Sequence, residues 1–245
     1  MWGEIEFRCG IICIVTKGRA IMKKRIPLSQ RVLPDYKKGE EIMNMVTHIT
    51  GGALGIIVLI VSILKAITRQ DAVGIVSVII YGISMICLYT MSSVYHGLNT
   101  GTGKKVMQII DHCTIYFLIA GTYTPILLCA VRRVSPVLAW GLLAVQWALA
   151  LFAATLTAID LKKYNVFSMI CYILMGWSII FFVPKTIAAL SITGFTLTLA
   201  GGIVYTIGAI LYGIGSKVHW MHSVFHIFVV IGSLLQFTAI YLFAI

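Results

Sequence analysis

Two histidines near the C-terminus have a spacing typical of metal ligands. His222 and His226 are four positions apart, so on a helix their side chains stack on one face, about 6 Å apart. Two imidazoles in this arrangement can bind a single metal ion, as they do in the HExxH pattern. A catalytic zinc site takes a third protein ligand from elsewhere in the fold and keeps one position for water. The pair therefore predicts a metal site that a distant residue must complete.

Residues in two other segments have types that fit such a site. His96 is the predicted third ligand, so that His96, His222 and His226 would together hold Zn²⁺. Asp111 is the one acidic residue inside the chain's long apolar segments. An isolated carboxylate there is costly unless it meets a cation, a metal or hydrogen-bond donors. Ser92 lies one turn before His96 and shares its helix face.

The histidines also have structural interpretations. His222 and His226 could lie at the membrane interface and hydrogen-bond to neighbouring helices, and His96, next to Gly97, could cap a helix end. Applied jointly, this interpretation must explain why metal-compatible groups from separate helices converge at one depth. For the remaining three histidines, supporting or interface roles are favoured over ligation; these are His48, His112 and His219. His219 shares a face with the pair and is an alternative ligand.

Asp111 and Ser92 have alternatives of their own. Asp111 could pair with Lys104 or Lys105, or it could favour the N-terminus of its helix through the helix dipole. Ser92 taken singly is typical of a serine that packs between helices. Sequence alone leaves these alternatives open.

The composition places all these residues in a membrane protein. Hydrophobic residues make up 60% of the 245 residues and charged residues 11%, with a mean hydropathy of +0.98; soluble globular domains have about 45–50% apolar and about 25% charged residues. The net charge of +11 comes from basic residues in the N-terminal segment and short loops, where they set membrane orientation. Because no aromatic-interleaved basic patch is present, nucleic acid is not an expected partner. We expect a weakly ordered basic arm at 1–41 and one membrane domain at 42–245.

Seven apolar segments predict an all-α, polytopic bundle of seven transmembrane helices. They cover about 42–65, 73–96, 106–131, 134–159, 165–184, 194–215 and 218–243. Each is near or above the ~20 residues that a helix needs to cross ~30 Å of hydrocarbon. The boundary between the fifth and the sixth is the least marked, because 184–194 is only weakly polar. Two glycine pairs, Gly51-Gly52 and Gly201-Gly202, are expected to permit close helix packing.

The basic residues indicate which helix ends face the cytoplasm. From Lys23 onward, with a cytoplasmic N-terminus, eleven Lys and Arg residues lie on the cytoplasmic side and five on the opposite side. The positive-inside rule then favours a cytoplasmic N-terminus and an extracytoplasmic C-terminus. Odd helices begin and even helices end on the cytoplasmic side, so all six histidines lie in the cytoplasmic half. The expected location is the cell membrane.

The cysteines argue against a disulfide framework or a thiolate zinc site, because none of the six forms a CxxC pair. Four lie in apolar segments and are expected to be buried as small hydrophobic residues; these are Cys87, Cys113, Cys129 and Cys171. Cys9 and Cys13 lie in the N-terminal arm and receive no function. Met22 is an alternative start of the chain.

Three motifs, in their order along the chain, resemble those of the haemolysin III family, the bacterial branch of the progestin and adipoQ receptor (PAQR) superfamily. They are the segments Ser92–His96, Asp111–Pro125 and His222–His226, and Glu41–His48 is similar to the start of that family's first helix. The resemblance extends from about residue 40 to the C-terminus, whereas 1–21 have no counterpart. It implies seven helices with the N-terminus inside and a zinc ion held by His96, His222 and His226. It also places Asp111 and Ser92 near the metal-bound water and implies kinship with lipid hydrolases related to alkaline ceramidases.

Two function classes follow. In the first, the protein is a zinc-dependent hydrolase of a membrane lipid amide or ester, with Asp111 and Ser92 as catalytic residues. Asp111 would accept the proton of the water, and Ser92 would donate to the oxyanion or hold a ligand in place. A site near the cytoplasmic face suits a substrate that enters from the inner leaflet. In the second, it is not an enzyme but a pore-forming haemolysin or a zinc-stabilised, receptor-like protein. The sequence identifies no protein partner and no oligomeric state.

Overall fold

The computed structural model describes residues 27–215 and 217–245, and these residues form helices and no strands. Cys9, Cys13, Met22 and most of the predicted N-terminal arm lie outside the described residues. The chain divides into two compact units, 1–31 and 32–245. In the first unit, the described residues contain a short 3₁₀ helix, η1 (Leu28–Gln30). The second unit holds everything that follows.

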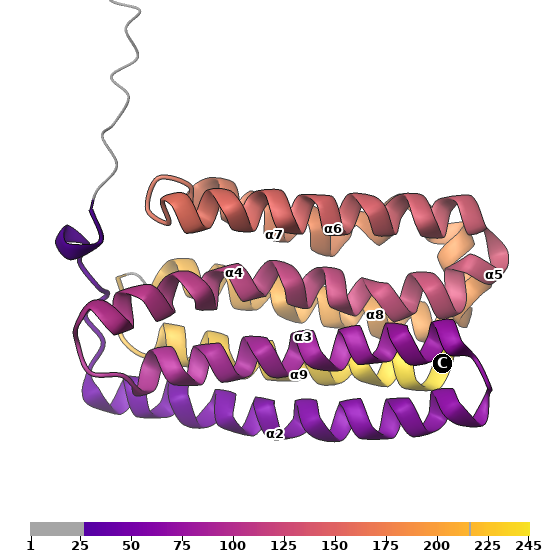
Figure 1. Ribbon diagram of the computed structural model, residues 1–245, viewed down its shortest axis with the longest axis horizontal. Helices are drawn as coiled ribbons and strands as arrows, with labels where there is room; N and C mark the ends of the chain where they lie inside the picture. The colour runs from indigo at the N-terminus through magenta and orange to yellow at the C-terminus, as the bar shows by residue number, and fades with distance from the viewer. Residues whose placement is uncertain (1–26, 216) are drawn as a thin grey trace, which may run out of the picture. The chain divides into compact units, whose positions relative to one another are not determined.

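Six helical stretches within the described residues are long and apolar enough to cross a membrane. By element they are α2 (Lys38–Thr68), α3 (Ala72–Gly97), α4 (Thr102–Pro125) with η2 (Ile126–Val131) and α5 (Arg132–Val134), α6 (Pro136–Ile159), α7 (Asn165–Trp177) with η3 (Ser178–Phe182) and α8 (Val183–Gly215), and α9 (Met221–Ala239) with η4 (Ile240–Ala244). They run along a common direction, with α2, α3 and α9 together on one side, α6 and α7 on the other, and α4 and α8 between them (Figure 1). The expected all-α membrane bundle is confirmed at this level.

The fifth stretch contains both the fifth and the sixth predicted segments. Its 51 residues would measure about 75 Å as one straight helix, more than twice the ~30 Å hydrocarbon core. Its first part, α7, runs along α4. Tyr172 of α7 donates to the carbonyl of His112 at 2.8 Å, and further along, Tyr123 of α4 donates to the carbonyl of Gly176 at 2.7 Å. α7 therefore leads from the His112 level of the bundle to the Tyr123 level.

The second part, α8, leads back. Near its start, Lys185 donates to Ser135 at 3.1 Å, at the end of the bundle where α5 and α6 meet. Ser191 then interrupts the helical geometry with φ 63° and ψ 170°, a left-handed φ that is strained for a residue with a Cβ. At the far end of α8, a Cβ added to Gly215 would lie 2.8 Å from the backbone nitrogen of His222. The stretch thus reverses direction, and α8 runs beside α9 (Figure 1).

Close packing depends on the first glycine of each predicted pair. A Cβ added to Gly51 would lie 2.5 Å from the Tyr89 ring of α3, whereas one on Gly52 would meet its nearest neighbour at 3.8 Å. Likewise, a Cβ on Gly201 would lie 2.7 Å from a side-chain amide of α9, and one on Gly202 would meet nothing within 4 Å. Gly51 and Gly201 therefore allow the close approach of helices, and their neighbours do not take part in it.

The cysteines divide by burial. Cys129 and Cys171 are buried as expected, and Cys113 is half-buried. The expectation is wrong for Cys87, which lies on a face of α3 that the bundle leaves exposed. An exposed cysteine is stable there because its small, weakly polar side chain is compatible with an apolar environment. All four described cysteines are free thiols.

Gly51→Ala should lower the free energy of unfolding by about 1–3 kcal/mol, because the added methyl group forces α2 away from Tyr89. Gly52→Ala is the matched control: it should be neutral or stabilise by up to about 1 kcal/mol through helix propensity. Thermal unfolding of the two variants in detergent measures the difference. Equal destabilisation by both would contradict this packing.

Candidate metal centre

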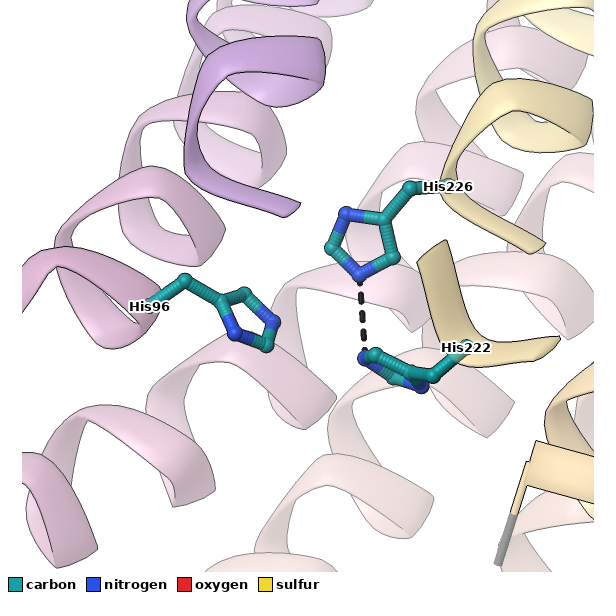
Figure 2. Close-up of side chains that lie close together, drawn as sticks. All are labelled: His96, His222 and His226. Atoms are coloured by element: carbon teal, nitrogen blue, oxygen red, sulfur yellow. Dashed lines mark hydrogen bonds between the residues drawn. The ribbon is translucent and has the colours of Figure 1, made fainter. Parts of the chain in front are cut away.

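Three buried imidazoles meet inside the bundle. His96 comes from the last turn of α3, and His222 and His226 come from the first turns of α9. One ring nitrogen from each lies within 4.8 Å of those of the other two, and the Nε2 atoms of His222 and His226 are 3.0 Å apart. Figure 2 shows the His96 ring pointing toward this pair. The helices therefore bring together the three predicted ligands, with exposed fractions of 3%, 7% and 1%.

The donor set fits a metal ion such as zinc. Within the described part of the chain, Nε2 of His96 is buried without a hydrogen-bond partner, and a buried polar atom without a partner is costly. Imidazoles bind zinc at ~2.0–2.1 Å, which places tetrahedral ligand nitrogens ~3.3 Å apart. The ring nitrogens of the three histidines are 3.0 Å to at most 4.8 Å apart, so small side-chain shifts would bring them to this geometry. The identity of the metal stays a prediction.

Asp111 and Ser92 lie on one cavity with two of these histidines. Both line its wall together with His222 and His226, and the Ser92 side chain lies close enough to the Asp111 carboxyl group to interact with it. The Asp111 side chain is 14% exposed. Its nearest ring nitrogen is Nδ1 of His112, at 3.8 Å. Asp111 and Ser92 therefore share a cavity wall with His222 and His226, and their catalytic role stays a prediction.

Lys104, one of the two lysines considered as partners of Asp111, forms an ion pair with a different carboxylate. Lys104 Nζ lies 2.8 Å from Glu41 Oε1, so this ion pair joins the start of α4 to the start of α2. Lys104 also donates to the carbonyls of His96 and Leu98 at 3.3 and 2.9 Å, which satisfies acceptors at the end of α3 that the helix leaves free.

The other three histidines occupy three different environments. The His48 ring stacks on His226 with 3.7 Å between ring centroids. His112 is held through Nδ1 by the carbonyl of Gln108 at 2.8 Å and through Nε2 by Tyr212 at 3.2 Å. His219, the alternative ligand, has a side chain that is 51% exposed and pairs with a glutamate of α2 at 3.0 Å. It therefore lies apart from the three-histidine group.

Two residues near the group were not selected from the sequence. Glu41 Oε2 lies 2.6 Å from Nδ1 of His96, and the Tyr36 ring stacks on His222 at 4.8 Å between centroids, with 22° between planes. Burial, together with nearby Tyr212 and acidic groups, raises the pKa of Tyr36, so its hydroxyl stays neutral. Glu41 could have been selected from the sequence, because the polar residues at 41, 44 and 48 are spaced to share one helix face.

A long cavity leads from this group into the bundle. Its volume is about 170 Å³. Its lining runs along α4 from Asp111 to Ile126 and along α9 from His222 to Gln236, about 20 Å in each case at 1.5 Å per residue. Ionisable side chains gather at one end, and apolar side chains such as Val229 line most of the remaining wall. The cavity suits a ligand with a polar group at one end of a long apolar body.

Apolar helical stretches around a buried three-histidine group define a multi-pass membrane protein with a candidate metal centre. Comparison with known proteins identifies the particular family. The family described as haemolysin-III related matches residues 36–237, and the chain belongs to the haemolysin III family. The predicted resemblance is thus confirmed.

The curated relatives agree with this assignment. The chain is 38% identical over 198 residues to Hemolysin-3 of Bacillus cereus, covering 81% of this chain and 89% of the relative. It is 38% identical over 206 residues to the Hemolysin-3 homolog of Bacillus subtilis (strain 168), covering 84% and 95%. A more distant relative in the PAQR superfamily is the human Monocyte to macrophage differentiation factor, 25% identical over 170 residues, covering 66% and 68%. No solved structure gives a significant match.

The three-histidine group should bind about one zinc ion per chain, because a catalytic site of this type uses three protein ligands. Replacing His222 and His226 together by alanine should remove the bound metal, since one of three nitrogens would remain. Elemental analysis after gentle detergent extraction measures this. His219→Ala is the control and should keep the metal. Equal metal content in the double variant and the wild type would contradict the site.

Proposed function

We propose that this protein is a zinc-dependent hydrolase that cleaves an amide or ester bond of a membrane lipid. One observation carries the proposal: Asp111 and Ser92 line a long, largely apolar cavity together with His222 and His226, two members of the three-histidine group. A metal-compatible site beside a carboxylate supplies the groups that hydrolysis needs, and the cavity supplies a place for a hydrocarbon chain.

Each group has a separate task in the reaction. Bound at His96, His222 and His226, zinc would supply Lewis-acid chemistry that activates water and polarises the substrate carbonyl. Asp111 would accept the proton of the attacking water and return it to the leaving group. The Ser92 hydroxyl, which lies close to Asp111, would orient that carboxylate or donate to the developing oxyanion.

The cavity favours a lipid as the substrate. A carbonyl at the histidine end would leave an acyl chain to follow the apolar wall along α4 and α9 for about 20 Å, a large part of the ~30 Å hydrocarbon core. In the opposite half of the bundle, the side-chain NH₂ groups of two glutamines donate to helix carbonyls. Gln146 donates to the carbonyl of Met175, and Gln236 donates to that of Thr198. This arrangement favours hydrolysis over a pore, which needs a continuous polar path.

We also propose seven membrane crossings, with the N-terminus in the cytoplasm and the C-terminus outside. The reversal between α7 and α8 supports two crossings within 165–215, and the excess of basic residues on one side supports the orientation. The metal centre then lies in the cytoplasmic half, in reach of inner-leaflet lipids.

Hydrolysis can be measured as release of free fatty acid in proteoliposomes that contain ceramide as the amide probe or a diacyl phospholipid as the ester probe. Asp111→Asn should reduce turnover by about 10²- to 10⁴-fold, because it removes the general base, and should keep the zinc. Gly202→Leu should reduce hydrolysis of long-chain lipids, because Gly202 lines the cavity and a side chain there has open space to fill.

Gly141→Leu is the matched control, since Gly141 is exposed on α6 and outside the cavity lining. Full activity of Asp111→Asn, or no hydrolysis of either probe by zinc-loaded wild type, would contradict the enzyme. Dye leakage from the same vesicles with wild type, abolished in the histidine variants, would indicate the pore-forming alternative.

The topology can be tested by labelling single cysteines with a membrane-impermeant thiol reagent. Three exposed lysines mark the two ends of the α7–α8 stretch and its middle. Lys162→Cys and Lys217→Cys should react only from the cytoplasmic side and Lys185→Cys only from outside, because the stretch crosses twice. Labelling of positions 162 and 217 from opposite sides would indicate a single crossing.

A further inference from the structure

We propose that Glu41 is a positioning residue for His96: its carboxylate fixes the imidazole in the one tautomer that leaves Nε2 free to bind the metal. The inference rests on the proposed metal site and adds a residue that does not itself touch the metal. It is carried by the hydrogen bond between the two side chains.

The Glu41 carboxylate is held from both sides. Oε2 lies 2.6 Å from Nδ1 of His96, and Oε1 lies 2.8 Å from Nζ of Lys104. The exposed fractions of the His96, Lys104 and Glu41 side chains are 0%, 6% and 19%, so solvent screens these contacts weakly. Three helices, α2, α3 and α4, therefore contribute to one arrangement at the metal centre.

The position of the carboxylate determines which nitrogen carries the proton. An ionised carboxylate only accepts hydrogen bonds, so Nδ1 of His96 must be the protonated nitrogen that donates to Glu41. The lone pair then lies on Nε2, which is buried and has no hydrogen-bond partner among the described residues. A histidine that ligates a metal through one nitrogen and donates the other N–H to a carboxylate is the common arrangement in metal sites.

Asn44 offers the competing explanation. Its side-chain nitrogen lies 3.4 Å from the same Nδ1. An amide N–H that donates to Nδ1 would put the ring proton on Nε2 and block ligation. The contact with Glu41 is shorter by 0.8 Å (3.4 − 2.6) and is charge-assisted, so it should prevail over the amide. Without the Glu41 carboxylate, Asn44 would be the remaining partner of His96 Nδ1. The ring proton would then move to Nε2, and this tautomer cannot bind the metal through Nε2.

The inference is tested first without metal. The ¹⁵N spectrum of the histidine rings in metal-free wild type should show His96 protonated at Nδ1, whereas Glu41→Ala should shift the proton toward Nε2. Glu41→Gln keeps the shape and an acceptor oxygen but loses the charge, so its spectrum should be intermediate. The ring signals of His222 and His226 in the same spectra report whether a variant has kept the folded site.

Zinc affinity, measured by competition with a chromogenic chelator, is the second readout. Glu41→Ala should bind zinc about 10- to 100-fold more weakly, the loss typical of removing a carboxylate that orients a ligand, and Glu41→Gln should fall between it and the wild type. Glu40→Gln is the matched control: the neighbouring carboxylate caps α2 and pairs with His219, so zinc affinity should stay within about twofold of wild type.

Each outcome decides the inference. An unchanged His96 spectrum and unchanged zinc affinity in Glu41→Ala would overturn it, as would an equal loss of affinity in Glu40→Gln. If Asn44→Ala lowered zinc affinity as much as Glu41→Ala does, the residue that positions His96 would be Asn44 instead of Glu41. If wild type binds no zinc, the proposed function fails, while the metal-free ¹⁵N spectra still accept or reject the Glu41–His96 tautomer.

Discussion

Ring nitrogens inside an apolar helix bundle must find partners, because hydrocarbon offers none and an unpaired buried polar group is costly. In this protein one ring nitrogen from each of the buried residues His96, His222 and His226 lies within 4.8 Å of the others, and Nε2 of His96 has no hydrogen-bond partner among the described residues. A metal ion satisfies such nitrogens directly. The arrangement of the neighbouring side chains depends on this cluster, because some of them position its imidazoles and others line the cavity beside it.

The groups around the cluster follow from this constraint. Glu41 and Lys104 neutralise each other beside His96, so that a carboxylate can orient the ring without remaining an unpaired charge. Asp111 and Ser92 lie on the wall of a cavity that is polar at one end and apolar further along. The separation of polar and apolar surfaces along one cavity matches the two ends of a lipid, which is why hydrolysis explains the arrangement better than a pore does.

Much of this was predictable from local sequence. The four-residue spacing and helical periodicity predict that His222 and His226 stack, and the order of the apolar segments gives His96 a similar depth. The partners of Lys104 were not predictable, because Asp111 and Glu41 are both acidic residues near a helix start and only the packing of α2 against α3 and α4 decides between them. The break at Ser191 falls inside the boundary expected at 184–194, but its exact residue was not predictable, because neither glycine nor proline occupies the position with the positive φ.

The most direct test of the account is the ligand shell of the bound metal, measured by zinc X-ray absorption spectroscopy on the purified protein in detergent. The account predicts three imidazole nitrogens at about 2.0–2.1 Å, an additional light atom from water, and no sulfur. A shell that contains sulfur at about 2.3 Å, or one with the same imidazole contribution after His96→Ala, would contradict a centre built from these three histidines.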